Sequence, residues 1–495
     1  MTLAERCQNL LKSTGLYSIA VFAGRMASFI LLPIYTRYLS PADYGVMELL
    51  DLTGSVLTIL IGMRFGQSLF YFCSLDISQE QRDRYISTAT FGAVLLGGMA
   101  ALSGMVCSRP LSLIIFGTPQ YANLLHLVFL TFGISLVVEV GFCYMRMLDR
   151  SGTYARVSLY RLAVAIALNL LLLVTFRMGI GGILWSSLIV AAGTGCYMLW
   201  YVLSPIQISF DFRLFAELCR YSFPLGISGL SMFLLHYGDR FFLLKYVSLS
   251  EIGIYALAYK LGMIISYLQM PFDIYWNAQM FSIVKGPDGD RLYTRICTYL
   301  MLGLTFAVVL LGLFITPIIG VLAGPGFHAA SSLVPWIAAA YVIRTVGAHF
   351  RSVFLLKKET AKDARVTIVG AAACLLAYAL LIPSFGIWGA AVATGVGFAV
   401  MFVFGLWDAQ RVRRFEFEFR RMWTIAICAV VILSVFALIK PANLWGQISV
   451  ALLFTALFPA LLLLSRFFTD TEKQAMHLVW QRGIAWSRRS LSYEV

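Results

Sequence analysis

Long apolar stretches joined by short polar turns make up most of the chain, and this pattern restricts its fold more than any other feature. An α-helix needs about 20 apolar residues to cross the hydrocarbon core of a bilayer. Charged residues make up only 13% of the 495 residues, whereas a soluble domain carries about 25%. We therefore predict an all-α, polytopic membrane protein with about 14 transmembrane helices. The predicted spans are 14–37, 44–73, 85–107, 122–146, 154–176, 179–203, 221–246, 252–283, 296–322, 330–356, 364–383, 386–408, 422–439 and 443–465.

The positive charges are distributed unevenly between the two sets of helix ends. One set is rich in Lys and Arg, as at 146–156, 357–365 and 411–421. The opposite ends carry only Arg37, Arg109, Arg177, Lys245 and Lys440. The positive-inside rule then places both termini in the cytoplasm. The net charge of +14 is explained by this topology and by attraction to membrane lipid, so nucleic acid is not an expected partner.

The sequence contains an internal repeat. "RYLSPADYGVMELLDLTG" (37–54) and "KYVSLSEIGIYALAYKLG" (245–262) align at a constant offset of 208, and "GIGG" at 179 aligns with "GIWG" at 386. Because six spans separate the repeats, the two halves should share one orientation and be related by a pseudo-twofold axis along the membrane normal. We then expect the substrate site between the halves, near the membrane midplane.

The repeat also sets the predicted domain boundaries. They are an N-terminal six-helix bundle (1–203), a cytoplasmic interfacial linker (204–220), a second six-helix bundle (221–410), two extra transmembrane helices (411–465) and a cytoplasmic tail (466–495). The tail has the composition of an interfacial amphipathic helix, and a frayed end is the alternative.

Three segments carry a family resemblance: "ILLPIYTRYLSPADYGVMELL", "YSFPLGISGLSMFLLHYGDRFFLLKYVSLSEIGIYALAYKLG" and "PFDIYWNAQMF". They resemble the polysaccharide flippases, the Wzx-like oligosaccharide branch of the multidrug/oligosaccharidyl-lipid/polysaccharide (MOP) exporter superfamily. The resemblance implies translocation of an undecaprenyl-pyrophosphate-linked oligosaccharide from the cytoplasmic to the periplasmic leaflet by alternating access, for polymers such as O-antigen or exopolysaccharide. It also implies a bacterial inner (cytoplasmic) membrane as the location, and polysaccharide polymerase or glycosyltransferases as possible partners.

Four cations at membrane depth are candidates to bind the pyrophosphate: Arg25, Arg64, Lys260 and Arg344. A charge at the centre of a membrane helix costs about 2.5–3.5 kcal/mol, so such residues normally face a wet cavity or a partner. Arginine also matches phosphate with a bidentate fork. The structural alternative is that these residues form ion pairs or snorkel, and so only hold helices together.

A second group of charges lies toward the outer ends of the spans. Glu48 and Asp51 share one helical face with Ser55 and Thr58, and Asp239 and Arg240 are adjacent in the seventh span. We interpret these four charged residues as a periplasmic gate that closes by ion pairing. The acids are equally candidates to bind a coupling H⁺ or Na⁺, and a static salt bridge is the bland alternative.

Tyr259 and Tyr267 are candidates to contact sugar, since they lie eight residues apart and could share a helical face. An interfacial aromatic belt is the competing interpretation for the other aromatic residues of that span.

Other functional classes fit the sequence less well. No G-x-x-x-x-G-K-[ST] motif occurs and the nine cysteines are scattered, so we expect neither a nucleotide-driven pump nor a metal site, and no catalytic residue is predicted. A multidrug exporter of the same superfamily and a membrane glycosyltransferase or ligase remain the alternatives. We expect no cofactor beyond a coupling ion.

Overall fold

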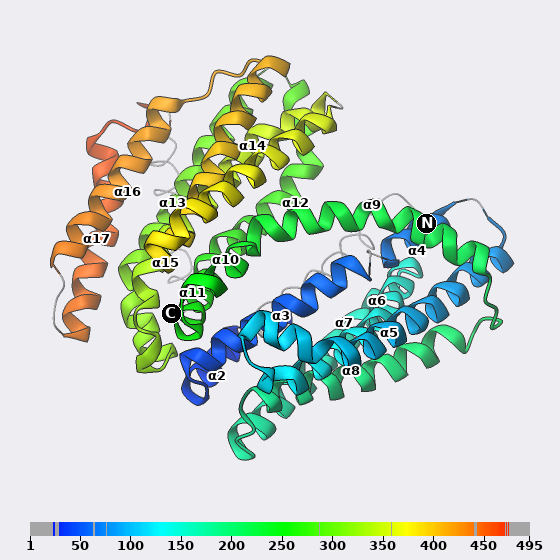
Figure 1. Ribbon diagram of the computed structural model, residues 1–495. Coiled ribbons are helices and arrows are strands. Elements are labelled where there is room, and N and C mark those ends of the chain that lie inside the picture. Colours follow the sequence, from blue (N-terminus) through cyan, green and yellow to red (C-terminus); the bar gives the residue numbers. More distant parts are fainter. Residues whose placement is uncertain are drawn as a thin grey trace, which may run out of the picture. The chain divides into compact units, whose positions relative to one another are not determined.

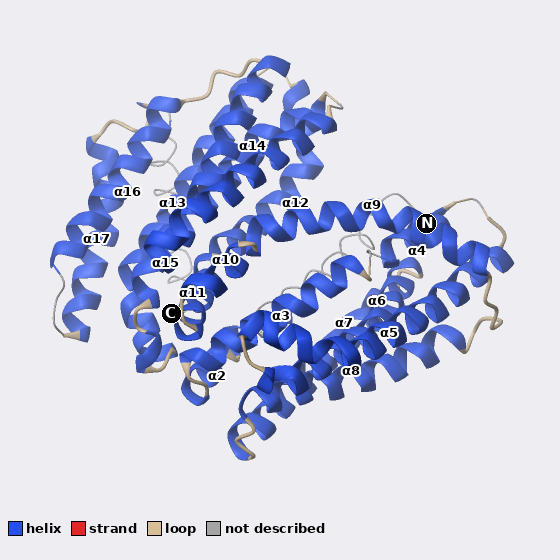
Figure 2. Ribbon diagram, viewed as in Figure 1, coloured by secondary structure: helices blue, strands red, loops and turns tan. Residues whose placement is uncertain are grey.

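The computed structural model describes residues 23–24, 29–62, 65–75, 77–286, 288–357, 359–439, 443–470, 472 and 474. Over this part of the chain all regular secondary structure is helical (Figure 2). The helices are α2 (Leu32–Tyr38), α3 (Pro41–Leu60), α4 (Phe65–Ser74), α5 (Gln79–Phe116), α6 (Ala122–Met147), α7 (Ser151–Asn169), α8 (Gly179–Leu203), α9 (Phe212–Tyr237), α10 (Asp239–Tyr246), α11 (Leu249–Gly262), α12 (Ile264–Lys285), α13 (Gly289–Leu322), α14 (Ala330–Leu356), α15 (Thr360–Val412), α16 (Phe419–Ile439) and α17 (Leu444–Leu464). The predicted all-α membrane fold is therefore confirmed.

Eleven of the described helical segments are long and apolar enough to cross a membrane, and the difference from the predicted fourteen has identifiable causes. The predicted spans 364–383 and 386–408 lie in the single segment α15, which bends at Gly386, where φ is 53°. The predicted span 221–246 corresponds to α9 and α10, which meet at Gly238 and are not among the eleven. The first predicted span lies mostly outside the described residues.

The chain divides into two compact units. The first comprises Met1–Ala258, Gly320–Ala330 and Ala371–Gly397, and the second comprises Tyr259–Ile319, Ser331–Gly370 and Phe398–Val495. This division follows packing rather than sequence similarity, so the domain boundaries drawn from the repeat stay predictions.

In the first unit, α5, α6 and α8 pack side by side (Figure 1). Gly97 of α5 faces Gly133 of α6 so closely that a Cβ on either would overlap the carbonyl oxygen of the other. Lipid tails are as apolar as the helices, so membrane helices gain little by burying apolar area and instead associate through close packing of small residues. The glycine pair thus explains how two long apolar helices are held together.

The repeated hairpin begins its second helix in the same way in both copies. The Ser40 hydroxyl accepts a hydrogen bond from the Asp43 N–H (3.1 Å), and the Asp43 carboxylate accepts one from the Ser40 N–H (3.1 Å). Ser248 and Glu251 repeat this capping box at the start of α11, with corresponding distances of 3.2 and 3.0 Å. A capping box satisfies two backbone donors that a helix end leaves open. The Ser-x-x-acid spacing in both repeats is therefore a helix start.

The two capped helices also touch each other, within the first unit. A Cβ at Gly45 of α3 would overlap the Leu249 carbonyl oxygen, and a Cβ at Gly253 of α11 would overlap that of Pro41. The offset of 208 relates Gly45 to Gly253 and Pro41 to Leu249, so the contact is reciprocal. Reciprocal contacts of this kind are what a twofold axis produces.

In the second unit, α16 and α17 pack on α13. Ile425 and Ile432 of α16 and Phe458 of α17 are buried with Val309 and Leu313 of α13 in one apolar cluster. The ring centroids of Phe306 and Phe458 lie 5.7 Å apart. The two extra helices thus have an apolar attachment to the rest of the second unit.

The few described residues that follow α17 are held by a polar contact. Arg421 Nη2 lies 2.9 Å from Glu472 Oε2, and the Thr469 N–H donates to the same carboxylate at 2.8 Å. Burial raises the pKa of the Glu472 carboxyl, but hydrogen bonds from Tyr299 and Thr469 and the charge of Arg421 lower it more, so the net shift is downward. Most of the predicted cytoplasmic tail, and with it the predicted amphipathic helix, lies outside the described residues.

Candidate functional site

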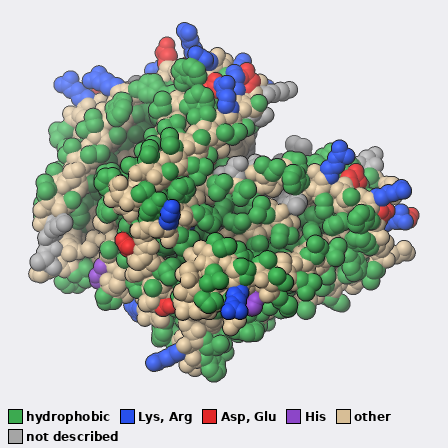
Figure 3. All heavy atoms as spheres, viewed as in Figure 1, with side chains coloured by type: hydrophobic (Ala, Val, Ile, Leu, Met, Phe, Trp, Pro, Cys, Tyr) green, Lys and Arg blue, Asp and Glu red, His purple; other side chains and the backbone are tan. Residues whose placement is uncertain are grey.

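A polar stripe runs along α3 in the first unit. Asp51, Ser55 and Thr58 are exposed, while Leu49, Leu50 and Leu52 of the same helix are buried. Figure 3 shows that visible side chains over the helix bodies are mostly hydrophobic and that Lys and Arg gather over helix ends. An exposed polar stripe on a membrane helix is costly against lipid but favourable against water. The Ser55 and Thr58 hydroxyls donate to carbonyls of the preceding turn, so Asp51 is the residue that makes this stripe a candidate face of an aqueous path.

At the outer end of this stripe lies a buried ion cluster. The Arg240 Nη1 group donates to Asp239 Oδ1 at 2.8 Å, and Arg240 Nε lies 3.4 Å from Glu48 Oε1. The Tyr255 hydroxyl donates to Asp239 Oδ2 at 2.5 Å. The side chains of Asp239 and Arg240 are 0% and 1% exposed, whereas Glu48 is 21% exposed. The structure thus brings three of the four predicted gate residues together, and Asp51 lies one helical turn from them on α3.

The turn between α13 and α14 packs near the same end of the first unit. The Thr36 hydroxyl donates to the Leu322 carbonyl at 3.0 Å, and Arg37 Nη2 donates to the Val321 carbonyl at 3.1 Å. The rings of Tyr44 and Phe327 meet edge to face, 5.6 Å apart. Contacts from α2, α3 and this turn therefore surround the end of the hairpin whose helix carries Glu48.

Arg344 lies on α14 in the second unit, in a polar setting. Its Nη2 group donates to Ser266 Oγ of α12 at 3.3 Å, and its guanidinium carbon lies 5.5 Å from the ring centroid of Tyr341. Its Nε atom is buried and has no hydrogen-bond acceptor among the described residues. The nearby Thr345 hydroxyl donates to Gln269, which donates to Asp273 at 2.9 Å. Arg344 is thus held in place but keeps unused hydrogen-bonding capacity.

The other candidates in the second unit differ in accessibility. Tyr259 is 1% exposed, and its hydroxyl accepts a hydrogen bond from Tyr341 at 2.8 Å. Tyr267 and Lys260 are half-buried. Tyr259 lies on α11 and packs on Tyr341, whereas Tyr267 lies on α12, so their spacing of eight residues does not give them equal exposure. The position of Tyr259 favours packing over sugar contact, and that of Tyr267 leaves its ring accessible.

The cationic candidates Arg25 and Arg64 lie outside the described residues. Within the described part of the chain, no group of three or more His, Cys, Asp or Glu could hold a metal ion. The sequence interpretation missed Ser266, Tyr341 and Tyr255 as partners of charged groups. A signal existed for Tyr341, because it precedes Arg344 by three residues and so shares its helical face.

Residues 10–272, more than half of the chain, match the profile of the family described as "Polysaccharide biosynthesis protein". The chain belongs to the polysaccharide biosynthesis protein family. This result confirms the resemblance inferred from the repeated hairpin, at the level of the family. Among curated proteins, the chain is similar to an uncharacterized membrane protein, MJ1068, of Methanocaldococcus jannaschii, with 24% identity over 145 aligned residues. The aligned segment covers 29% of this chain and only 28% of MJ1068.

Solved structures show which fold this family member has. The lipid II flippase MurJ, in an inward closed conformation, matches with a TM-score of 0.71 at 13% identity, over 90% of this chain and 98% of MurJ. An inward-facing multidrug resistance MATE family transporter of the MOP superfamily matches with a TM-score of 0.64 at 14% identity, over 81% of this chain and 98% of that one. The polysaccharide biosynthesis protein is therefore a multi-pass membrane protein with the fold of MOP transporters.

Proposed function

We propose that this chain is a flippase that moves an undecaprenyl-pyrophosphate-linked oligosaccharide from the cytoplasmic to the periplasmic leaflet of a bacterial inner membrane. The family match supports a role in polysaccharide biosynthesis. The fold is shared with a protein named for flipping lipid II. On this proposal the chain has no catalytic residue and works by alternating access.

The observation that carries this proposal is the setting of Arg344. Its depth in α14 makes its charge expensive, yet the structure gives its guanidinium one hydrogen bond to Ser266 and leaves Nε without an acceptor among the described residues. A pyrophosphate supplies several charged oxygens that such a fork can bind in pairs. On this proposal Arg344 binds the pyrophosphate, together with Arg25, Arg64 and Lys260.

The ion cluster of the first unit is then assigned to the gate. Arg240 contacts the carboxylates of Glu48 and Asp239. If α3 moves away from α10 when the gate opens, the ion pair between Arg240 and Glu48 must break. The cluster contains two acids and one arginine, so it has one acid more than it has bases, and an H⁺ or Na⁺ from the periplasm could balance that acid. Coupling to one of these ions therefore belongs to the proposal as its second part.

The test is reconstitution of the full chain into proteoliposomes with a fluorescent undecaprenyl-pyrophosphate oligosaccharide. Leaflet exchange is scored by the access of a membrane-impermeant lectin to the sugar. We expect exchange in wild-type vesicles, none in protein-free vesicles, and faster exchange when the coupling gradient, H⁺ or Na⁺, is imposed.

Two parallel measurements address the alternative functions. Vesicles loaded with cationic dyes test drug export, and mass analysis of the recovered glycan tests transferase or ligase chemistry. Absence of lipid exchange together with dye efflux would replace the proposal with a multidrug exporter. A lengthened or transferred glycan would replace it with an enzyme.

A further inference from the structure

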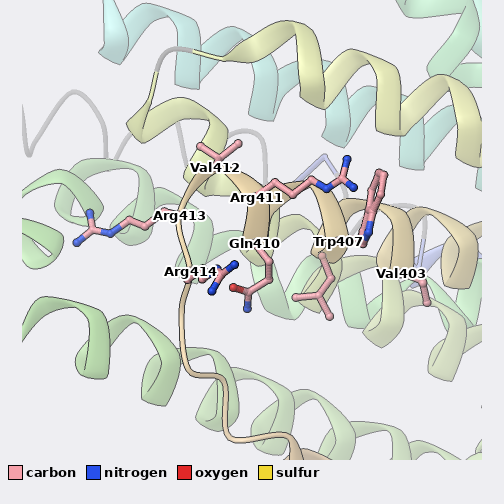
Figure 4. Close-up of a pocket in the computed structure, with 8 residues that line it drawn as sticks. Val403, Trp407, Gln410, Arg411, Val412, Arg413 and Arg414 are labelled. Carbon is pink, nitrogen blue, oxygen red and sulfur yellow. The ribbon is translucent and has the colours of Figure 1, made fainter.

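A surface pocket of about 700 Å³ lies in the second unit, where α15 ends and the chain turns toward α16 (Figure 4). It is lined by Val403, Leu406, Trp407, Gln410, Arg411, Val412, Arg413 and Arg414. No acidic residue is among them. The charge distribution along the sequence assigns this helix end to the cytoplasmic side of the membrane.

The backbone that carries these arginines is fixed in place. The Gln410 side chain donates to the Phe415 carbonyl at 2.8 Å and accepts from the Phe415 N–H at 3.0 Å. Phe415 is buried and stacks on Tyr293, with ring centroids 4.4 Å apart. The backbone that forms the pocket is therefore held in one conformation by defined contacts.

The three arginines have different roles. Arg413 donates to Asp290 at 2.6 Å and points away from the other two, so its charge is already balanced (Figure 4). The Arg411 guanidinium lies over the Trp407 ring, 3.5 Å from its centroid. Neither Arg411 nor Arg414 forms an ion pair with any described residue, and both are exposed. Two positive charges are therefore available to an anion, and the Trp407 ring holds that of Arg411 in place.

A second, apolar wall of the pocket runs along the face of α15 that also carries Arg411. Val403 and Trp407, one helical turn apart on α15, are 63% and 49% exposed. On a membrane helix, exposed Val and Trp near the end face lipid, and Trp prefers the level of the headgroups. A ligand that satisfies both walls must have an anion at one end and a hydrocarbon chain at the other.

We propose that this pocket binds an anionic phospholipid of the cytoplasmic leaflet, with its phosphate held by Arg411 beside the turn that carries Arg414 and an acyl chain along Val403 and Trp407. Basic pockets on the cytoplasmic side of membrane proteins suit lipid headgroups, and arginine provides paired donors for phosphate oxygens. A free phosphate would use only the basic wall and leave the apolar one without a function. This site is separate from the residues assigned to transport and does not depend on the proposed function.

The experiment compares lipid retention by the purified full chain, using native mass spectrometry with titrated phosphatidylglycerol or cardiolipin. The variant Arg411→Gln/Arg414→Gln removes the two available charges and should weaken retention about thirtyfold, if each arginine contributes the typical interfacial energy. The matched control, Arg420→Gln/Arg466→Gln, removes two exposed arginines elsewhere in the same unit and should retain lipid like the wild type. Phosphatidylcholine should bind both variants and the wild type equally.

A second readout locates the bound chain. Brominated phosphatidylglycerol quenches the fluorescence of nearby tryptophans. In Trp407→Phe, the amount of fluorescence that is quenched should fall by the contribution of Trp407. Equal lipid retention by the pocket variant and the control would overturn the proposal, as would unchanged quenching in Trp407→Phe. Displacement of the lipid by low concentrations of inorganic pyrophosphate would also overturn it, because it would identify a site for free phosphate.

Discussion

At the scale of single residues, the second unit shows how a charge can be positioned without being neutralised. Arg344 is held by Ser266 and the Tyr341 ring, and no carboxylate among the described residues lies within ion-pair distance of it, although the Asp273 carboxylate is near enough to interact electrostatically. A salt bridge would have offset the cost of burial but would also have occupied the donors. This setting leaves the Nε donor available, which is what a binding residue requires.

Arg344→Ala should abolish glycan export in cells that lack their own transporter, with the protein level unchanged. Arg344→Lys should restore only part of it, because the positive charge returns without the bidentate fork. The same prediction applies to Arg25→Ala and Arg25→Lys. Arg291→Gln, which changes an exposed arginine of the second unit, is the control and should export normally. Normal export by both alanine variants would remove these residues from the site.

Arg240 differs from Arg344 because it is paired with carboxylates. Its contribution to the stability of the first unit can therefore be measured. Arg240→Met leaves the Asp239 carboxylate buried without its guanidinium, and we expect a loss of about 3–5 kcal/mol of unfolding free energy. Asp239→Asn/Arg240→Met removes both charges and should recover most of this loss. Glu48→Ala should cost less than Arg240→Met, because Glu48 is partly exposed and its ion pair is longer.

These variants are compared by thermal unfolding in detergent. Equal melting temperatures for the single and the double variant would show that the buried pair does not act as a unit.

At the scale of helices, the close contact between α3 and α11 depends on the glycines Gly45 and Gly253 of the two repeated hairpins. Gly45→Ala or Gly253→Ala places a Cβ on a backbone oxygen that cannot move aside. We expect each to destabilise the protein by about 1–3 kcal/mol, a typical cost of overpacking. The double variant should cost less than the sum of the two, because both relieve the same contact by separating the same helices.

Gly98→Ala is the matched control for this pair. Gly98 also lies inside a helix, but nothing stands within 4 Å of a Cβ at that position. It should stabilise the helix by up to about 1 kcal/mol, since alanine has the higher helix propensity. Additive losses in Gly45→Ala/Gly253→Ala would show that the two glycines do not share one contact.

Much of the arrangement of helices follows from the sequence, but the contacts between them do not. The 208-residue offset predicted that the two hairpins are equivalent, and the identical capping boxes agree with that. The offset does not predict that Gly45 and Gly253 touch, because equivalent positions in two repeats need not be close in space. Likewise, adjacency of acid and base predicted an ion cluster, whereas the burial of Tyr259 depends on its contact with Tyr341 of another helix, which no local pattern marks.

The pocket at 403–414 illustrates a different difficulty. Its arginines are part of the positive charge that sets the orientation of the chain, so the sequence interpretation assigned them to topology. Only the packing of Phe415, which fixes the turn, distinguishes a built pocket from an ordinary basic loop end. The i, i+4 spacing of Trp407 and Arg411 was a local signal for the stacking.

At the scale of the whole molecule, α16 and α17 lie outside the repeat. They carry no charge between residues 422 and 439 or between 443 and 464, so they offer nothing to a pyrophosphate. Their buried faces pack on α13, while Ile427, Val430 and Leu453 are exposed. We therefore propose that their exposed faces contact the lipid tail of the substrate rather than its sugar, with simple packing as the alternative.

Photo-crosslinking separates these two roles. A diazirine amino acid at Ile427, Val430 or Leu453 should label a polyprenyl-pyrophosphate probe, and one at the buried Ile425 or Ala451 should not. The reaction is scored by the mass of labelled peptides. Labelling confined to the spans of the repeats would leave packing as the role of α16 and α17.

The reciprocal glycine contact also suggests how the chain arose. Two copies of a six-span ancestor would meet through this same contact, each glycine facing the partner's carbonyl, so the fused chain retains the geometry of a homodimer. Fusion allowed the two copies to diverge independently. By the offset of 208, Glu48 corresponds to Ala256 and Arg240 to Leu32, so the ion pair exists once where a true dimer would have had two or none. The two repeats are therefore equivalent in their glycine contact but not in their charges, and the ion pair lies on one side of the axis.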